Sequence, residues 1–311
     1  MSILTIILLL VGFVFLIKGA DMFVDGASDL ATKLKIPSMI IGLTIVAFGT
    51  SAPEAAVSVS SALSGSNAIA ISNVVGSNIF NMLAVIGITA VLYKIDITRE
   101  SLVHDFPIML VSSILLLIFI FTGSQISRLE GILFMAMIIA YVAFLIYKSM
   151  KQSSKMPVGT THLSNGYILV YIVIGIIGII LGGNLVVDSS KEIALSIGMS
   201  ETLVGLTIVS IGTSLPELIT SVTAAYNKKT DIAIGNAIGS CIFNILFILG
   251  LTNTISPIKT TNIMFIDTLI MIIVAVITYI LAYDKKDFNR KDGLILIALF
   301  LIYMIYIILR N

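Results

Sequence analysis

Two motifs place a carboxylate beside a proline inside strongly apolar sequence. GTSAPE occupies 49–54, and GTSLPE occupies 212–217. An acidic side chain at membrane depth is costly, and such residues are functional by default. The spans expected to pack around these motifs hold no basic residue that could neutralise Glu54 or Glu217. Two such carboxylates at matching positions indicate a paired ion site.

The two motifs belong to a longer internal repeat. GSNIFN at 76–81 recurs as GSCIFN at 239–244, with the same offset of 163 residues that separates the glutamate motifs. Between Gly42 and Gly87 the register needs no gap, and 24 of 46 positions are identical to their partners. The chain is therefore an internal duplication, and a repeat decides the architecture before any other feature does.

The composition is that of an integral membrane protein. The chain has 311 residues, of which 58% are hydrophobic and 11% charged, and its mean hydropathy is +1.12. Long continuous apolar runs predict helices, since barrel strands alternate and span only about ten residues, whereas a spanning helix needs roughly 20. We predict an all-α protein with ten transmembrane helices at 3–23, 39–63, 68–93, 102–121, 129–147, 167–188, 202–226, 232–252, 262–283 and 292–309.

Basic residues between these spans lie mostly on one side. Thirteen lysines and arginines fall on the side of the 149–166 connection and four on the other. Positively charged loops stay in the cytoplasm. We therefore expect a multi-pass plasma-membrane protein with a cytoplasmic 149–166 linker and both termini extracellular.

An odd number of spans in each half inverts the second half. Residues 1–148 form the first predicted transmembrane repeat and 167–311 the second, joined by the short cytoplasmic linker 149–166. With five spans each, the two repeats enter the membrane from opposite faces. This arrangement is typical of secondary transporters, whose sites lie near the midplane between discontinuous helices. We expect the second and third helices of each half to be broken.

The motif residues would supply oxygen ligands to such a site. Pro53 has no N–H for the Gly49 carbonyl, so the helix should open around 47–52 and expose backbone oxygens to a cavity. Glu54 then starts the resumed helix, where the macrodipole favours an ionised carboxylate. On the helical spacing, Thr50 and Ser51 lie on the side of Glu54, and Ser77 and Asn81 share one face. The second copy contributes Thr213, Ser214, Glu217, Ser240 and Asn244.

A cage of oxygens with two negative charges suits a hard cation. Ca²⁺ takes 6–8 oxygen ligands in flexible geometry, whereas Mg²⁺ is smaller and sheds water reluctantly. Ca²⁺ would be neutralised by the Glu54–Glu217 pair, and more than one Na⁺ would be needed for the same charge. Competition of Na⁺ and Ca²⁺ for one site is the simplest physical basis for exchange.

These doubled motifs resemble the sodium/calcium exchanger branch of the cation/calcium antiporter superfamily, in its prokaryotic form without a regulatory loop. The resemblance rests on GTSAPE and GTSLPE, on GSNIFN and GSCIFN, and on the five-plus-five plan. It implies Na⁺/Ca²⁺ antiport by alternating access, with Ca²⁺ on Glu54 and Glu217 and on the backbone carbonyls of Thr50 and Thr213. It also assigns Na⁺ sites to two triads: Ala47, Ser51 and Ser77; and Ser210, Ser214 and Ser240.

By the same resemblance, Asn81 and Asn244 flank the centre of the site. Some relatives carry Asp at one of these places, including the potassium-dependent branch in its second repeat. Here both residues are Asn, which argues against potassium co-transport. Cys241, the only cysteine, stands at the repeat position of Asn78 and is expected to be a small packing residue.

Alternative functions remain open. A Ca²⁺/H⁺ antiporter would use the same two glutamates as proton carriers, although proton-coupled relatives usually show Asn rather than Thr-Ser beside the first glutamate. A channel would show flux independent of a counter-ion. An intramembrane enzyme has little support, because no nucleophile–base pair, His-rich metal motif or phosphate loop is present. We expect no cofactor, no nucleic-acid partner and no protein partner.

Overall fold

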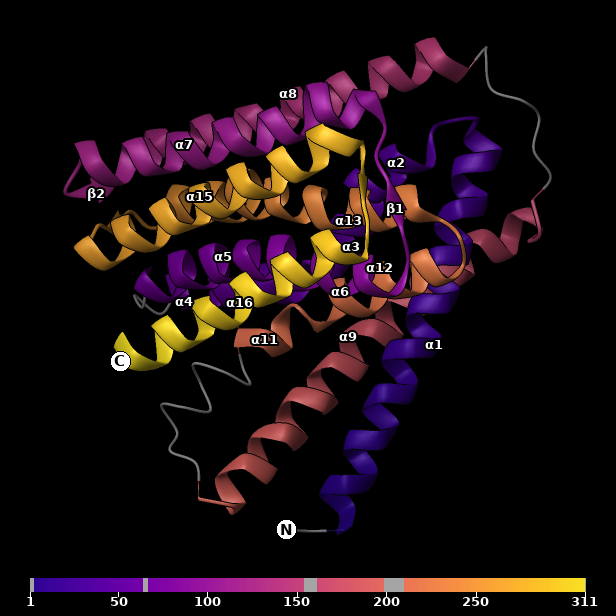
Figure 1. The fold of residues 1–311 in the computed structure, drawn as a ribbon, viewed down its shortest axis with the longest axis horizontal. Coiled ribbons are helices and arrows are strands. Elements are labelled where there is room, and N and C mark those ends of the chain that lie inside the picture. The colour runs from indigo at the N-terminus through magenta and orange to yellow at the C-terminus, as the bar shows by residue number, and fades with distance from the viewer. Residues whose placement is uncertain (1–2, 64–66, 154–160, 199–209, 311) are drawn as a thin grey trace.

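The protein is almost entirely helical in its computed structural model, which describes residues 3–63, 67–153, 161–198 and 210–310 (Figure 1). Segments labelled η are π-helical. The first half consists of α1 (Ile3–Leu34), α2 (Ser38–Ile41), η1 (Gly42–Val46), α3 (Ala47–Thr50), α4 (Ala52–Leu63), α5 (Asn67–Phe80), η2 (Asn81–Val85), α6 (Ile86–Leu92), β1 (Ile95–Asp96), η3 (Ser101–Asp105), α7 (Phe106–Thr122), β2 (Gln125–Ile126) and α8 (Arg128–Ser153). The second half consists of α9 (Asn165–Ser196), α11 (Ser210–Thr213), α12 (Leu215–Tyr226), α13 (Thr230–Phe243), η5 (Asn244–Leu249), α14 (Gly250–Ile255), β3 (Ile258–Lys259), α15 (Asn262–Lys285), β4 (Asp287–Phe288) and α16 (Arg290–Arg310).

Most of the expected spans are found as long apolar helices. Within the described residues, eight helices are long and apolar enough to cross a membrane, and a bent pair makes a ninth candidate. The expected span at 202–226 lies partly outside the described residues. Several helices outrun their apolar stretches: α1 continues to Leu34, α9 to Ser196, and α8 enters the expected linker as far as Ser153. A helix does not have to end where its hydrophobic run ends, because polar residues are accommodated beyond the membrane.

The breaks follow the prolines. The second segment bends by 50° between Ser38–Thr50 and Ala52–Leu63, next to Pro53. The expected breaks in the third helices are wrong. Residues 69–92 and 230–255 each run as one continuous helix, since neither stretch contains a proline. Each helix instead changes to π geometry at an asparagine, Asn81 in one and Asn244 in the other.

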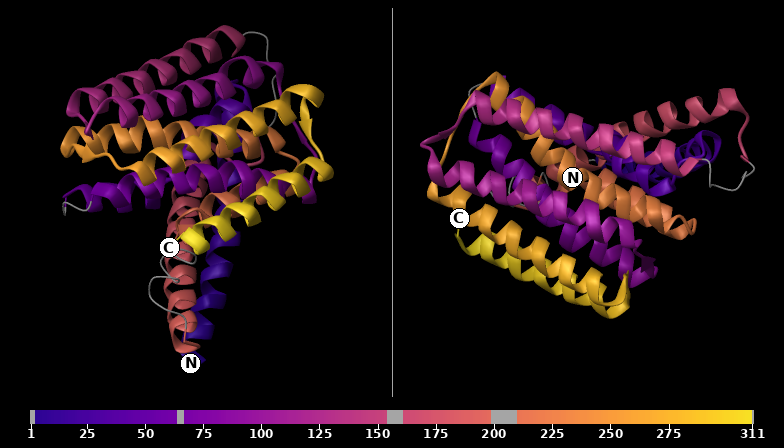
Figure 2. Two further views of the ribbon diagram at one scale, coloured as in Figure 1. Left: turned by 60° about the vertical axis from the view of Figure 1, so that its left-hand side comes forward. Right: turned by 90° about the horizontal axis from the view of Figure 1, so that it is seen from above.

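Helices α1 and α9 form a pair that crosses the other helices at a steep angle (Figures 1 and 2). The contact is close because glycines line it. A Cβ on Gly182 would lie 2.5 Å from the Leu16 backbone nitrogen and 2.7 Å from the Gly12 carbonyl oxygen. Close helix approach through small residues is a common mode of packing in membranes.

Replacing Gly182 with alanine should therefore force α1 and α9 apart. We expect the Gly182→Ala variant to lose roughly 1–3 kcal/mol of stability, the usual cost of overpacking, measured as a lower thermal unfolding temperature of the purified protein. Gly183→Ala is the matched control, because its new Cβ would meet nothing closer than the Pro216 side chain at 3.6 Å. Equal unfolding temperatures for the two variants would contradict the close contact.

Two short antiparallel sheets join the halves. Strand β1 pairs with β4, and β2 pairs with β3. Strand β3 follows β1 at the repeat offset of 163 residues, and β4 follows β2 at 162 residues, one fewer. Each half therefore gives one strand to each sheet, and the two pairings are reciprocal.

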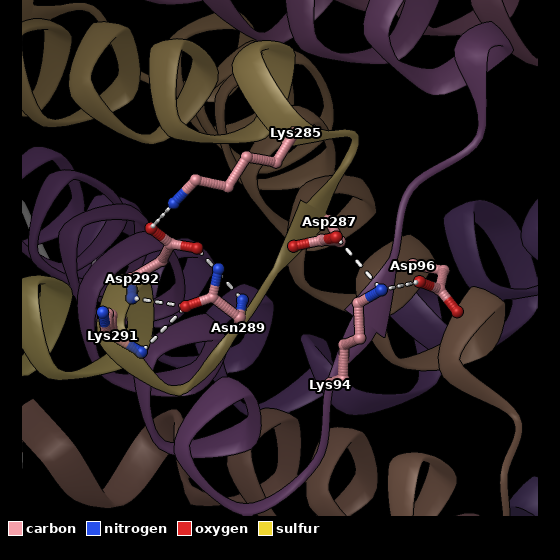
Figure 3. Close-up of polar contacts among 7 residues, drawn as sticks. All are labelled: Lys94, Asp96, Lys285, Asp287, Asn289, Lys291 and Asp292. Atoms are coloured by element: carbon pink, nitrogen blue, oxygen red, sulfur yellow. Dashed lines mark hydrogen bonds and ion pairs between the residues drawn. The ribbon is translucent and has the colours of Figure 1, made fainter.

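Ion pairs lie beside the β1–β4 sheet and at the start of α16 (Figure 3). Lys94 Nζ lies 3.1 Å from Asp287 and 3.1 Å from Asp96, and the hydrogen bonds that it donates to these carboxylates raise the pKa of Lys94. At the start of α16, the Asp292 side chain accepts a hydrogen bond from the Asn289 backbone N–H (3.1 Å) and pairs with Lys285 (3.2 Å). Because Lys94 is exposed, its ion pairs contribute little to stability.

Candidate cation site

The site is built on two helix breaks. Ser51 closes α3 with backbone angles of φ −83° and ψ 10°, and Ser214 precedes α12 with φ −95° and ψ 6°. Around the first break, backbone bonds run from Ser51 N to Ala47 O and from Ala55 N to Ser51 O, each 3.0 Å long. Pro53 cannot donate in between. A new helix starts after each break, and the positive end of its macrodipole lies at the break.

Both glutamates lie in the first turn of these new helices and are fully buried. Each one accepts a hydrogen bond from the serine of the opposite half. Ser51 Oγ donates to Glu217 Oε1 at 2.8 Å, and Ser214 Oγ donates to Glu54 Oε1 at 2.9 Å. The four side chains therefore form one cluster, in which each half of the chain donates a hydrogen bond to the glutamate of the other half.

A second pair of serines approaches the same carboxylates from the neighbouring helices. Ser77 Oγ lies 3.4 Å from Glu54 Oε1, and Ser240 Oγ lies 3.5 Å from Glu217 Oε1. Both serines are buried. Ser214 Oγ also lies 3.1 Å from Ser77 Oγ. The hydroxyls predicted from the motifs thus gather around the two glutamates.

Several buried polar atoms in this cluster lack a hydrogen-bond partner among the described residues. They are the second oxygens of both carboxylates, the side-chain oxygen of Asn244 and both side-chain heteroatoms of Asn81. No ion pair reaches either glutamate within the described residues. Unpaired buried carboxylates are expensive, and a cation coordinated by these oxygens would offset that cost.

The remaining predicted ligands lie on the same elements. Ala47, buried, begins α3, and Thr50, also buried, ends it. Ser210 and Thr213 are the first and last residues of α11. The surroundings of the Ser210 side chain lie outside the part of the chain that the structure describes.

The profile of the family described as sodium/calcium exchanger protein matches residues 4–147 and 167–309. The chain belongs to this family. The two matched segments correspond closely to the two repeats, and the gap between them falls in the 149–166 connection.

Individual relatives of this exchanger-family chain support the assignment. It is 36% identical to the putative antiporter CaxA of Alkalimonas amylolytica over 96% of both chains. It is 32% identical to the sodium/calcium exchanger MaX1 of Methanosarcina acetivorans, over 96% of this chain and 97% of the relative. The solved structure of the sodium-calcium exchanger NCX_Mj, soaked with Na⁺ and Ca²⁺, superposes with a TM-score of 0.84 at 28% identity, covering 97% and 98% of the two chains. These relatives are named as transporters, and the chain is a multi-pass membrane protein of the antiporter class.

The structure of this family member also reveals two positioning residues that the sequence analysis missed. Asn236 donates to the Glu217 backbone oxygen (3.2 Å) and to Ser221 Oγ (2.9 Å), while its own oxygen accepts from Thr50 Oγ1 (2.9 Å). Asn73 makes the equivalent two donations, to the Glu54 backbone oxygen (3.3 Å) and to Ser58 Oγ (3.0 Å). Each asparagine ties the third helix to the glutamate-bearing helix. The signal was available, since Asn73 and Asn236 are identical at the repeat offset.

Proposed function

We propose that this chain exchanges Na⁺ for Ca²⁺ across the plasma membrane, by alternating access at one oxygen-lined site shared by both ions. The observation that supports this function best is the pair of buried glutamates. Each is hydrogen-bonded by a serine of the other half, and each keeps one buried oxygen that has no partner among the described residues. Two carboxylates that have no basic partner in the described part of the chain match the charge of one Ca²⁺. Ca²⁺ prefers a shell of several hard oxygen ligands.

In this proposal the halves 1–148 and 167–311 are inverted five-helix repeats, giving ten transmembrane helices. The reciprocal β1–β4 and β2–β3 pairings support it, and so do the crossed bonds from Ser51 to Glu217 and from Ser214 to Glu54. In each set, the two contacts are equivalent: interchanging the two halves of the chain turns one contact into the other. Such symmetry is the usual basis of alternating access in secondary transporters.

Ca²⁺ would bind between Glu54 and Glu217, with the backbone carbonyls of Thr50 and Thr213 completing its shell. Na⁺ would bind on either side of this position, with ligands from two triads: Ala47, Ser51 and Ser77; and Ser210, Ser214 and Ser240. Asn81 and Asn244 would flank the centre. A serine hydroxyl that donates to a carboxylate still presents a lone pair to a cation, so the same serines can serve both ions.

Coupling between the two ions follows from the free-energy cost of changing between the outward and inward states with no ion bound. Closing the site without an ion would leave two carboxylates unpaired in a low-dielectric interior, and the desolvation penalty for each is several kcal/mol. The transition between outward and inward states is therefore favoured only when cations neutralise the pair. The basic loops support an orientation with the 149–166 linker in the cytoplasm and both termini outside.

Reconstitution into vesicles tests the proposed coupling. We expect ⁴⁵Ca²⁺ uptake into proteoliposomes loaded with Na⁺ and diluted into Na⁺-free buffer, and no uptake when a K⁺ or H⁺ gradient replaces the Na⁺ gradient. Uptake driven by a pH gradient in the absence of Na⁺ would instead indicate a Ca²⁺/H⁺ antiporter. Flux that requires no counter-ion would indicate a channel.

A further inference from the structure

Asn78 and Cys241 are buried, occupy equivalent positions of the two repeats and differ in residue type, so the symmetry of the site is broken there. Each contacts the backbone of the other. Asn78 Nδ2 donates to the Cys241 carbonyl oxygen at 3.1 Å, and Cys241 Sγ lies 3.8 Å from the Asn78 carbonyl oxygen. Only Asn78 has a second polar atom to offer. Its Oδ1 accepts a hydrogen bond from Asn244 Nδ2 at 3.1 Å.

The direction of these bonds is decided by a backbone group. A carbonyl oxygen can only accept, so the Asn78 carboxamide must turn its nitrogen toward Cys241 and its oxygen toward Asn244. Asn244 must then present its own nitrogen to Asn78. Reversing either amide would bring two acceptors or two donors together. The chain of bonds therefore leaves Asn244 Oδ1, and not Nδ2, as the free atom, and this oxygen is buried without a partner among the described residues.

The free oxygen of Asn244 belongs to the face of α13 and η5 that carries the site. Asn244 follows Ser240 by one helical turn, and residues four apart share a helix face. Ser240 Oγ lies 3.5 Å from Glu217 Oε1. On the other side, Asn81 holds the equivalent place but faces no equivalent of Asn78, because a cysteine stands there. Neither side-chain heteroatom of Asn81 has a partner in the described part of the chain.

We propose that Asn78 is a positioning residue that holds the Asn244 carboxamide with its oxygen toward the cation, so that the site has one preoriented amide, Asn244, and one adjustable amide, Asn81. This inference rests on the proposed function and adds an asymmetry to it. Asn244 supplies a ready-made ligand, which lowers the cost of organising the site around Ca²⁺. The Asn81 amide can turn either its oxygen to a bound ion or its nitrogen to a carboxylate when no ion is bound.

Equilibrium ⁴⁵Ca²⁺ binding to the purified protein at low Na⁺ tests the inference. Asn78→Leu preserves volume but removes the acceptor, so the Asn244 amide can reverse. We expect Ca²⁺ affinity to fall by about five- to tenfold, the size of one lost orienting hydrogen bond. Cys241→Ser is the matched control at the equivalent position. It leaves the Cys241 backbone carbonyl that Asn78 uses, and it should bind Ca²⁺ like the wild type.

A double-mutant cycle separates positioning from simple packing. A carboxylate has oxygen on both sides and needs no orientation, so in an Asn244→Asp background the Asn78→Leu substitution should leave Ca²⁺ affinity unchanged or raise it. An equal loss in both backgrounds would overturn the positioning role, and so would the absence of a loss with Asn244 present. If the Leu side chain prevents folding, Asn78→Ala takes its place, and the same loss of Ca²⁺ affinity is expected for it.

The outcomes distinguish this inference from the function beneath it. If the wild-type protein binds no Ca²⁺, the proposed function fails and the inference with it. If the wild type binds Ca²⁺ and Asn78→Leu binds equally well, only the inference fails. If neither Asn78 variant can be isolated as a monodisperse protein, Asn78 serves the packing of α5 against α13 and the positioning role is rejected.

Discussion

Glu54→Gln and Glu217→Gln are each expected to abolish Na⁺-driven Ca²⁺ uptake while leaving the fold intact. Each substitution removes one of two buried charges that would neutralise Ca²⁺ and leaves the other carboxylate alone. Removing one partner of a buried pair of opposite charges, here the carboxylate that would face Ca²⁺, costs about 3–5 kcal/mol, which corresponds to a loss of roughly 100- to 4,000-fold. Initial rates of ⁴⁵Ca²⁺ uptake in proteoliposomes, normalised to the amount of reconstituted protein, measure this effect.

Glu192→Gln is the matched control for the glutamate variants. Glu192 is an exposed carboxylate on α9 that accepts a hydrogen bond from Thr5 Oγ1 at 2.6 Å, and it has no contact with the site. We expect it to transport at close to the wild-type rate. Near-normal exchange by either site variant would refute the proposed cation site. An unfolding temperature close to that of the wild type would show that the loss of transport is not a loss of structure.

Ser51→Ala and Ser214→Ala are expected to weaken the Na⁺ dependence of exchange by about tenfold each. Each change deletes a proposed Na⁺ ligand together with a charge-assisted hydrogen bond to the opposite glutamate, and such bonds are worth about 1.5–3 kcal/mol. The Na⁺ concentration for half-maximal Ca²⁺ efflux from Ca²⁺-loaded vesicles should rise accordingly. Because the two serines are equivalent under the repeat, their effects should be similar in size.

Ser112→Ala controls for the loss of a buried hydroxyl in general. Ser112 is fully buried, but its hydroxyl donates to the Ile108 carbonyl of its own helix at 2.7 Å. Its replacement should leave the Na⁺ dependence unchanged. If Ser51→Ala and Ser214→Ala also leave it unchanged while Ca²⁺ transport persists, these serines are not Na⁺ ligands, and coupling to another ion becomes the better account.

Local sequence was sufficient to select the glutamates and serines that the structure brings together at the proposed site. Glu54 and Glu217 stand out because a carboxylate beside a proline is rare in apolar sequence, and the duplication marks both at once. The bend at Ser51 was predictable, since Pro53 removes a backbone donor within its own helix. The third helices were predicted wrongly as broken, because no proline forces a break there. Their π segments at Asn81 and Asn244 arise instead where the chain packs around the site.

The repeat does not predict which residue of one half contacts which residue of the other. The sequence determined a duplicated, helical membrane protein with two acidic motifs and their hydroxyl neighbours, because these depend on composition and on spacing along one helix. Only the tertiary structure decided that Ser51 serves Glu217 and not Glu54, and that Asn78 engages Asn244. Hydrogen bonds between distant segments depend on the direction in which two packed helices face each other, and no local pattern encodes that direction.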